Sequence, residues 1–222
     1  MAYFTKDYIR FFKELEKNNN REWFSENKSR YEESVKLPFE KFVDDLIKAA
    51  AKLDKDITIE AKDAIYRIYK DVRFSKDKTP YKLNSGAIIS KFGRKSHDYP
   101  GFYVQLGADG MWIGGGAYMP SKEQLLDIRH EIKSNPEVMH QLLNDKKFKD
   151  AFTSLQGEQN KVMPAEFKSL ETAYPFIRNK QFYYMAEYDS KEILRDDLIE
   201  LCVSHFKAGI PLNNFLIKAM FQ

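Results

Sequence analysis

The chain has 222 residues, of which 43% are hydrophobic and 14% aromatic, so it is long enough and apolar enough to bury a substantial core. Basic residues exceed acidic ones by only three charges, which argues against a protein that captures nucleic acid through its overall field. One cysteine excludes an internal disulfide, and with no secretory leader and no bilayer-length apolar run, these features predict a soluble cytoplasmic protein.

Residues 5–52 show the apolar periodicity of helices. The pattern is interrupted at the three asparagines of positions 18–20, and asparagine is common both where helices end and where they begin. A second helical pattern runs from about Arg21 toward Ala51. Pro38 is expected to kink or divide this pattern, because proline lacks the amide donor and crowds the preceding turn.

Residues 64–118 change to a period of two, which is typical of strands. Four runs show it, AIYRIYKDVRF, SGAIISKF, GFYVQLG and MWIGGGAY, and turn residues separate them. The short ADG connection between the last two runs predicts a hairpin. We therefore expect an antiparallel meander rather than a parallel sheet.

Residues 121–222 return to mainly helical patterns. One further strand is predicted near 181–188, in QFYYMAEYD, and the chain continues with helical DDLIELCVSHFKAG followed by PLNNFLIKAMF. The predicted fold is a single α+β domain over residues 1–222. Its antiparallel sheet, a meander plus one late strand, is flanked by amino-terminal and carboxy-terminal helices.

The first predicted strand carries charge on one face. Alternation in IYRIYKDVRF assigns Tyr66, Ile68, Val72 and Phe74 to the core, with Lys70 as the exception on that side. The opposite face holds Ile65, Arg67, Tyr69, Asp71 and Arg73. A carboxylate between two guanidinium groups orients both and leaves donors directed outward, which suits a ligand with phosphate or carboxylate oxygens.

The loop after this strand adds to the candidate anion site. Lys78 supplies a further cation and Tyr81 a polar contact, while Pro80 restricts the loop and lowers its entropy loss on binding. Asp71 is the candidate catalytic group, either orienting the arginines or acting as a base. Whether the protein is an enzyme is not predicted.

Two further features extend the candidate site. Gly114, Gly115 and Gly116 interrupt a strand pattern, where glycine marks a bulge or a close approach, and they would open space if their strand lies near Arg67 and Arg73. Ser121 and Gln124 form a capping box whose helix N-terminus offers a possible anion site. The alternatives are a bend or packing against an aromatic ring for the glycines, and a plain helix cap for Ser121.

The segment RIYKDVRFSKDKTPY resembles the hallmark of a family of uncharacterised proteins, the domain of unknown function numbered 2461, which is seen in bacteria and fungi. That hallmark reads R-x-x-R-D-x-R-F-x-x-x-K-x-P-Y, and Lys70 stands where it has its second arginine. The segments NNNREWF, GGGAYMP and AYPFIRNKQFYY are similar to the family in the same order. The resemblance implies no activity, and by alternation Lys70 points away from the two arginines of the site.

Three functions stay open from the residues alone. The first is binding or turnover of a small anionic ligand at the arginine site. The second is nucleic-acid binding by the same loop, which the small net charge disfavours; its candidate residues are Lys76, Lys78, Lys82, Lys91, Arg94 and Lys95. The third is a buried ion network of Arg67, Asp71 and Arg73 that binds nothing. No metal site, cofactor or membrane contact is expected, and the oligomeric state is not predicted.

Overall fold

The computed structural model describes residues 2–221. These residues form two compact units. Of the described residues, unit 1 contains 2–94, 103–112 and 187–203, and unit 2 contains 95–102, 113–186 and 204–221. The prediction of a single domain stays a prediction, and the two units are described separately below.

Short helices with identifiable caps form the first part of unit 1. They are α1 (Lys6–Lys17), α2 (Arg21–Glu26), α3 (Lys28–Tyr31), the π-helical turn η1 (Glu32–Lys36), α4 (Leu37–Ala50) and α5 (Ala61–Ala64). Asn18 caps the end of α1, and the Asn20 side chain accepts a hydrogen bond from the amide of Trp23 at the start of α2. Pro38 lies in the first turn of α4, where the helix changes from the π-helical turn η1 to an α-helix; the backbone stays helical across it, so the pattern is not divided there.

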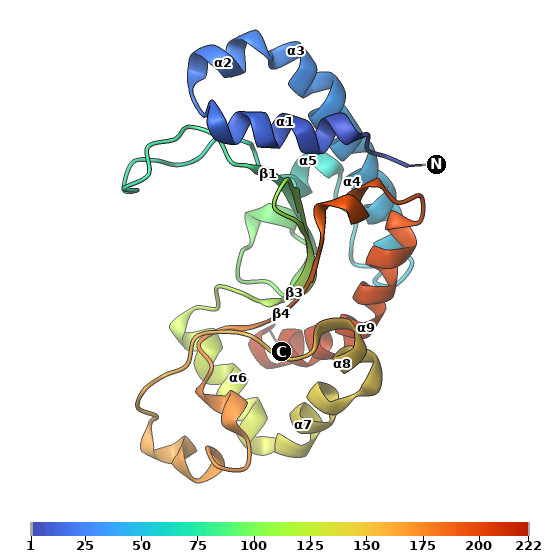
Figure 1. Cartoon of the computed structure of the whole chain (residues 1–222). Coiled ribbons are helices and arrows are strands. Elements are labelled where there is room, and N and C mark those ends of the chain that lie inside the picture. Colours follow the sequence, from blue (N-terminus) through green and yellow to red (C-terminus); the bar gives the residue numbers. More distant parts are fainter. Residues whose placement is uncertain (1, 222) are drawn as a thin grey trace. The chain divides into compact units, whose positions relative to one another are not determined.

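Four strands form one antiparallel sheet in the order β1-β2-β3-β4 (Figure 1). They are β1 (Asn84–Ile89), β2 (Gly101–Gly107), β3 (Met111–Ala117) and β4 (Phe182–Tyr188). The amide of Gly107 donates to the carbonyl of Gly110 at 2.9 Å, which closes the predicted hairpin. The α+β fold, with a meander and one late strand, is confirmed.

Helices dominate the rest of the chain. They are α6 (Lys122–Ser134), α7 (Pro136–Asn144), α8 (Lys146–Phe152) and α9 (Leu198–Phe221), with the 3-10 turns η2 (Gly93–Lys95), η3 (Ala165–Leu170), η4 (Pro175–Arg178) and η5 (Ser190–Leu194). The two helical patterns predicted at the end of the chain form one continuous helix, with Pro211 in its interior. Pro211 has no amide hydrogen, so the carbonyl of Lys207 loses its usual helical donor.

The prediction of a regular strand over residues 64–74 is wrong. The helical turn α5 ends at Ala64, and the chain then runs extended with only two antiparallel bridges, Ile65 to Ala87 and Tyr69 to Tyr81. Alternation of buried and exposed side chains does persist through this segment as far as Arg73. A period of two therefore indicated extended backbone correctly, but it did not indicate continuous strand pairing.

Candidate functional site

Residues 66–82, here called the basic hairpin, form an antiparallel turn in unit 1. The amide of Lys70 donates to the carbonyl of Pro80 at 2.9 Å, and the amide of Lys82 donates to the carbonyl of Ile68 at 2.8 Å. Figure 1 shows the segment as a long loop that projects beside α1. Its charge is local: six cations and two carboxylates give residues 66–82 a net charge of +4, against +3 for the whole chain.

Asp77 braces the tip of the basic hairpin. Its carboxylate accepts hydrogen bonds from Lys70 Nζ at 2.8 Å and from the amide of Thr79 at 2.9 Å. Lys70 Nζ also donates to the Thr79 hydroxyl at 2.7 Å. The Lys70 ammonium, followed by the Thr79 amide, lowers the pKa of Asp77 well below its usual range. Lys70 therefore stabilises the tip of the hairpin through Asp77 and Thr79.

Asp71 holds Arg73 in a bidentate ion pair. Arg73 Nε donates to one carboxylate oxygen at 2.9 Å and Arg73 Nη2 to the other at 2.7 Å. These bonds lower the pKa of Asp71 to about 2, with a smaller contribution from the charge of Arg67. Within residues 2–221, Arg67 is exposed and makes no hydrogen bond or ion pair of its own.

The ion pair is exposed, which does not fit the alternative of a buried structural network. The side chain of Arg73 is 76% exposed and that of Asp71 is 49% exposed. Exposed pairs contribute little to stability because solvent screens them. We therefore expect the Asp71–Arg73 pair to contribute little to the stability of the fold.

Two lysines of the loop also face solvent. Lys78 Nζ donates to the carbonyl of Val72 across the hairpin at 2.9 Å, so its ammonium has a fixed position. Lys76 is exposed, and in the described part of the chain it has no hydrogen-bond or ion-pair partner. Together with Arg67 and Arg73, these lysines leave the exposed side of the hairpin cationic.

Phe74 was predicted to enter the core, and that prediction is wrong. Its side chain is 96% exposed, the largest exposure of any bulky apolar residue described. The guanidinium carbon of Arg73 lies 5.9 Å from the centroid of its ring, within the range of a cation–π contact. The alternation that would have buried Phe74 ends one residue earlier, where the hairpin turns away from the protein. Phe74 is thus a candidate binding residue, which the sequence pattern wrongly assigned to the core.

Tyr81 lies at the base of the hairpin and is only 4% exposed. Its ring stacks on Phe24, with centroids 4.0 Å apart and planes at 15°. The side-chain amide of Asn19 donates to the Tyr81 carbonyl at 3.0 Å and accepts from its amide at 3.1 Å, as a paired strand would. The structure thus gives Tyr81 a packing role, and Asn19 anchors the hairpin to the turn between α1 and α2.

The three glycines of β3 lie in unit 2 against β4. A Cβ on Gly114 would lie 2.2 Å from the Tyr184 carbonyl oxygen, and one on Gly115 would lie 2.6 Å from the Tyr184 hydroxyl. Gly116 has φ +102°, and its Cβ would lie 2.2 Å from the Phe182 carbonyl oxygen. Close approach of β4 and of the Tyr184 ring therefore accounts for the glycines. That they also open space for an anion stays a prediction.

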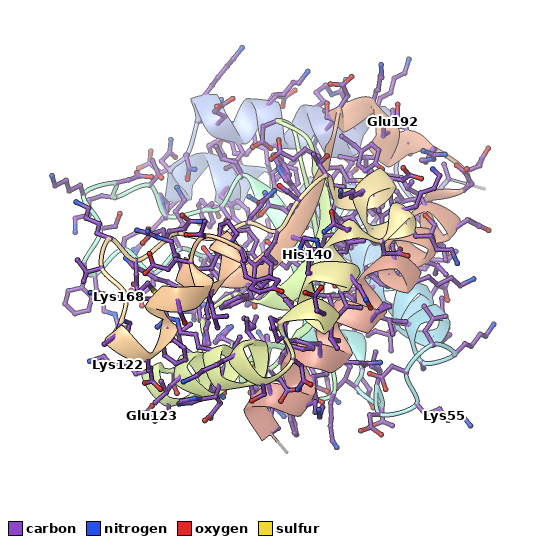
Figure 2. The ribbon with its side chains drawn as sticks, turned by 90° about the horizontal axis from the view of Figure 1, so that it is seen from below. Lys55, Lys122, Glu123, His140, Lys168 and Glu192 are labelled. Atoms are coloured by element: carbon purple, nitrogen blue, oxygen red, sulfur yellow. The ribbon has the colours of Figure 1, made fainter. Side chains whose placement is uncertain are left out.

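The predicted capping box of α6 is present. Ser121 Oγ accepts from the amide of Gln124 at 3.2 Å, and the Gln124 side chain accepts from the amide of Ser121 at 2.8 Å. Ser121 Oγ also donates to the Glu123 carboxylate at 2.8 Å. Lys122 and Glu123 project from this end of α6 (Figure 2). The nearby carboxylate offsets the positive end of the helix, so a plain cap accounts for Ser121; an anion there stays a prediction.

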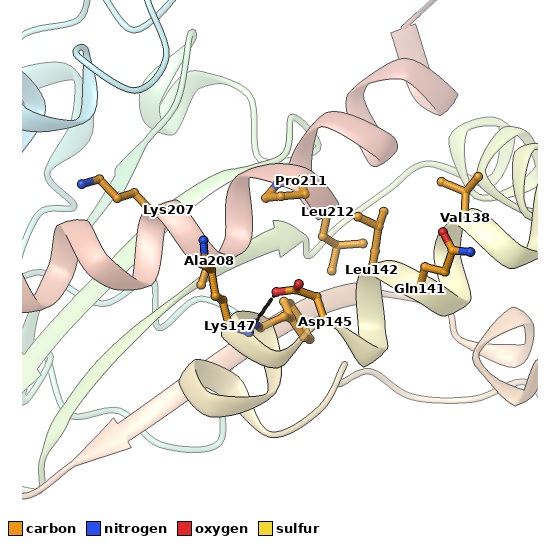
Figure 3. A pocket seen from close by; sticks show the side chains of 10 residues that line it. Val138, Gln141, Leu142, Asp145, Lys147, Lys207, Ala208, Pro211 and Leu212 are labelled. Carbon is orange, nitrogen blue, oxygen red and sulfur yellow. Dashed lines mark hydrogen bonds between the residues drawn. The ribbon is translucent and has the colours of Figure 1, made fainter.

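A pocket of about 380 Å³ lies within unit 2, between α7, α8 and α9 (Figure 3). Its apolar wall includes Leu142, Phe148 and Leu212, and Pro211 lies at its edge. The carboxylate of Asp145 also lines it but accepts from the amides of Lys147 and Phe148, as the N-cap of α8. None of the residues predicted for the anion site lines this pocket.

The remaining chemistry-bearing groups of the described residues form no further candidate site. Cys202 is buried, and burial raises the pKa of its thiol, which makes it a poor nucleophile. Among residues 2–221, no group of three or more histidine, cysteine, aspartate or glutamate side chains could hold a metal ion. Over the same residues, no helix combines the length and the apolar character needed to cross a bilayer.

Comparison with known families identifies the chain. A family model described as "Conserved hypothetical protein (DUF2461)" matches residues 7–215. The chain belongs to this family. The match covers the basic hairpin, the glycines of β3 and most of α9, so it includes all of the sheet and the candidate site. A search of curated proteins found no match.

Proposed function

We propose that the basic hairpin binds an anionic ligand, one with phosphate or carboxylate oxygens, through Arg67, Arg73 and Lys78. The observation that carries this proposal is the exposed, oriented guanidinium of Arg73. The Asp71 carboxylate accepts hydrogen bonds from Arg73 Nε and Nη2, and Arg73 Nη1 has no hydrogen-bond partner within residues 2–221. A planar donor group held in place in this way loses less conformational entropy on binding than a free side chain does.

The lowered pKa of Asp71 suits a residue that orients Arg73 rather than one that transfers a proton. Its pKa of about 2 keeps it ionised at neutral pH, and a general base works best when its pKa is near the working pH. A carboxylate with this lowered pKa loses its ion pair only as the pH falls from the pKa that the group has in the unfolded chain toward 2. Binding by Arg73 should therefore not depend on Asp71 titration between pH 5 and 8, which favours a binding role over a catalytic one.

Replacing Arg73 with alanine tests the proposal directly. Isothermal titration of wild-type protein with tripolyphosphate at low salt should show saturable binding. Arg73→Ala should weaken it by about tenfold or more, because hydrogen bonds between charged groups are the strong ones. The variant should melt close to wild type, since the side chain is exposed.

Arg195 offers a matched control. It makes the same bidentate pair with an aspartate two positions away, Asp197, at another place in unit 1. Arg195→Ala removes the same charge and should leave the affinity within about twofold of wild type, since it loses only a distant screened charge. Equal losses in both variants, or no saturable binding by the wild type, would contradict an anion site on the hairpin.

A further inference from the structure

Two cations of the basic hairpin each lie over an aromatic ring. Lys82 Nζ lies 5.2 Å from the centroid of the Tyr66 ring, and the Arg73 guanidinium carbon lies 5.9 Å from that of Phe74. Both rings thus lie beside a positive charge. One of them, Phe74, is almost wholly exposed.

Both pairs lie in the basic hairpin of unit 1. Burial and then the charge of Arg67 lower the pKa of Lys82, and the charge of Arg67 also contributes to the lowered pKa of Asp71. We call these residues of the basic hairpin the cation–aromatic stripe; its members are Tyr66, Arg67, Arg73, Phe74 and Lys82.

We propose that the anionic ligand of the basic hairpin is a single-stranded nucleic acid, with an unpaired base stacked on Phe74 and phosphates on Arg73, Arg67 and Lys82. This inference rests on the proposed anion site and names its ligand. Single-strand binders combine a cationic track for the backbone with aromatic rings on which bases stack. The stripe contains both components.

The form of the ligand follows from the exposure of the stripe. A fully exposed ring can stack on a splayed base, but it cannot reach a base inside a duplex. Exposed single contacts are weak, so a polymer that engages several cations together is favoured over a mononucleotide. An anionic membrane is the weaker candidate, because Phe74 is the one apolar side chain between Arg73 and Thr79 and would bury little area in lipid.

Fluorescence anisotropy with labelled oligonucleotides tests the inference. The probes are a 12-nucleotide oligothymidine, an abasic strand of the same length and a 12-base-pair duplex. Wild-type protein should prefer oligothymidine over both other probes. With three or four phosphates neutralised, its affinity should fall about 20- to 50-fold between 50 and 200 mM salt.

Two variants separate stacking from charge. Phe74→Ala should weaken oligothymidine binding by about 5- to 150-fold, the range for loss of one stacked base, and should leave abasic binding unchanged. Arg73→Ala should weaken both. Phe221→Ala, which removes another exposed phenylalanine in unit 2, is the control and should change neither.

The other outcomes overturn the inference in distinguishable ways. If the abasic strand and duplex bind as well as oligothymidine, and only Arg73→Ala weakens them, the nucleic-acid assignment fails while the anion site stands. Phe74-dependent sedimentation with phosphatidylserine vesicles, without oligothymidine binding, would replace the nucleic acid with a membrane. If neither tripolyphosphate nor any oligonucleotide binds, both proposals fail.

Discussion

Replacing Gly116 with alanine is expected to lower the free energy of unfolding by about 4 kcal/mol. Its φ of +102° is a conformation that alanine rarely adopts, and this alone costs roughly 1–3 kcal/mol. The new Cβ would also lie 2.2 Å from the Phe182 carbonyl oxygen and 2.7 Å from the Tyr183 Cα. Both are backbone atoms of β4, which cannot rotate away as a side chain could, so the strands must separate.

Thermal denaturation measures this effect, and Gly86→Ala is its control. A loss of about 4 kcal/mol lowers the midpoint by roughly 10 °C in a chain of this size. At Gly86 the nearest atom to a new Cβ is the Tyr103 hydroxyl at 3.0 Å, the far end of a side chain that can shift. Gly86→Ala should therefore melt only slightly below wild type. Equal midpoints for Gly116→Ala and wild type would show that β3 and β4 do not approach as described.

Replacing Asn213 with alanine is expected to cost about 3 kcal/mol. Asn213 is 4% exposed, accepts from the fully buried Tyr184 hydroxyl at 2.9 Å and donates to the Gly101 carbonyl at 3.3 Å. Removal leaves two buried polar groups without this partner, at roughly 1–3 kcal/mol each if they stay unsatisfied. Gly209 and Gly115 make room for the same hydroxyl, so the Tyr184 ring has little freedom to find another partner.

The adjacent residue provides a control for this effect. Asn214 lies on the exposed side of α9. Asn214→Ala removes the same atoms without leaving a buried polar group unpaired. It should melt at or slightly above the wild-type midpoint, because alanine has the higher helix propensity. Urea denaturation of the two variants gives the comparison. Similar midpoints for Asn213→Ala and Asn214→Ala would contradict the buried network.

Local sequence rules predicted most of the fold. The ADG turn and the capping box of Ser121 and Gln124 each depend on a few adjacent residues. The interior Pro211 did not end α9, because packing of the apolar positions around it can outweigh the cost of one proline. The irregular pairing of residues 64–74 was missed for a different reason: periodicity reports which side chains are exposed and not which backbone groups are hydrogen-bonded.

The candidate site could be predicted only in part. The Asp71–Arg73 pair spans two positions, so its geometry follows from the local backbone. Packing of Tyr81 on Phe24 and the bonds of Asn19 to Tyr81 join residues about 60 positions apart, which no local pattern reports. The exposure of Phe74 depends on where the hairpin leaves the protein surface. The sequence did contain one signal for the anchor, since NNNREWF and KTPY both belong to the family resemblance.

Mapping a bound anion by NMR is the most direct test of the central proposal, that the basic hairpin is a ligand-binding element. Amide ¹H–¹⁵N spectra of ¹⁵N-labelled protein would be followed during titration with tripolyphosphate, and arginine side-chain Nε signals would be recorded alongside. We expect saturable shifts confined to residues 66–82 and their anchor Asn19, with the Nε signals of Arg67 and Arg73 moving and that of Arg195 remaining in place. Shifts centred on the glycines of β3, on Ser121 or on the pocket beside α9, with the hairpin unchanged, would contradict the proposal.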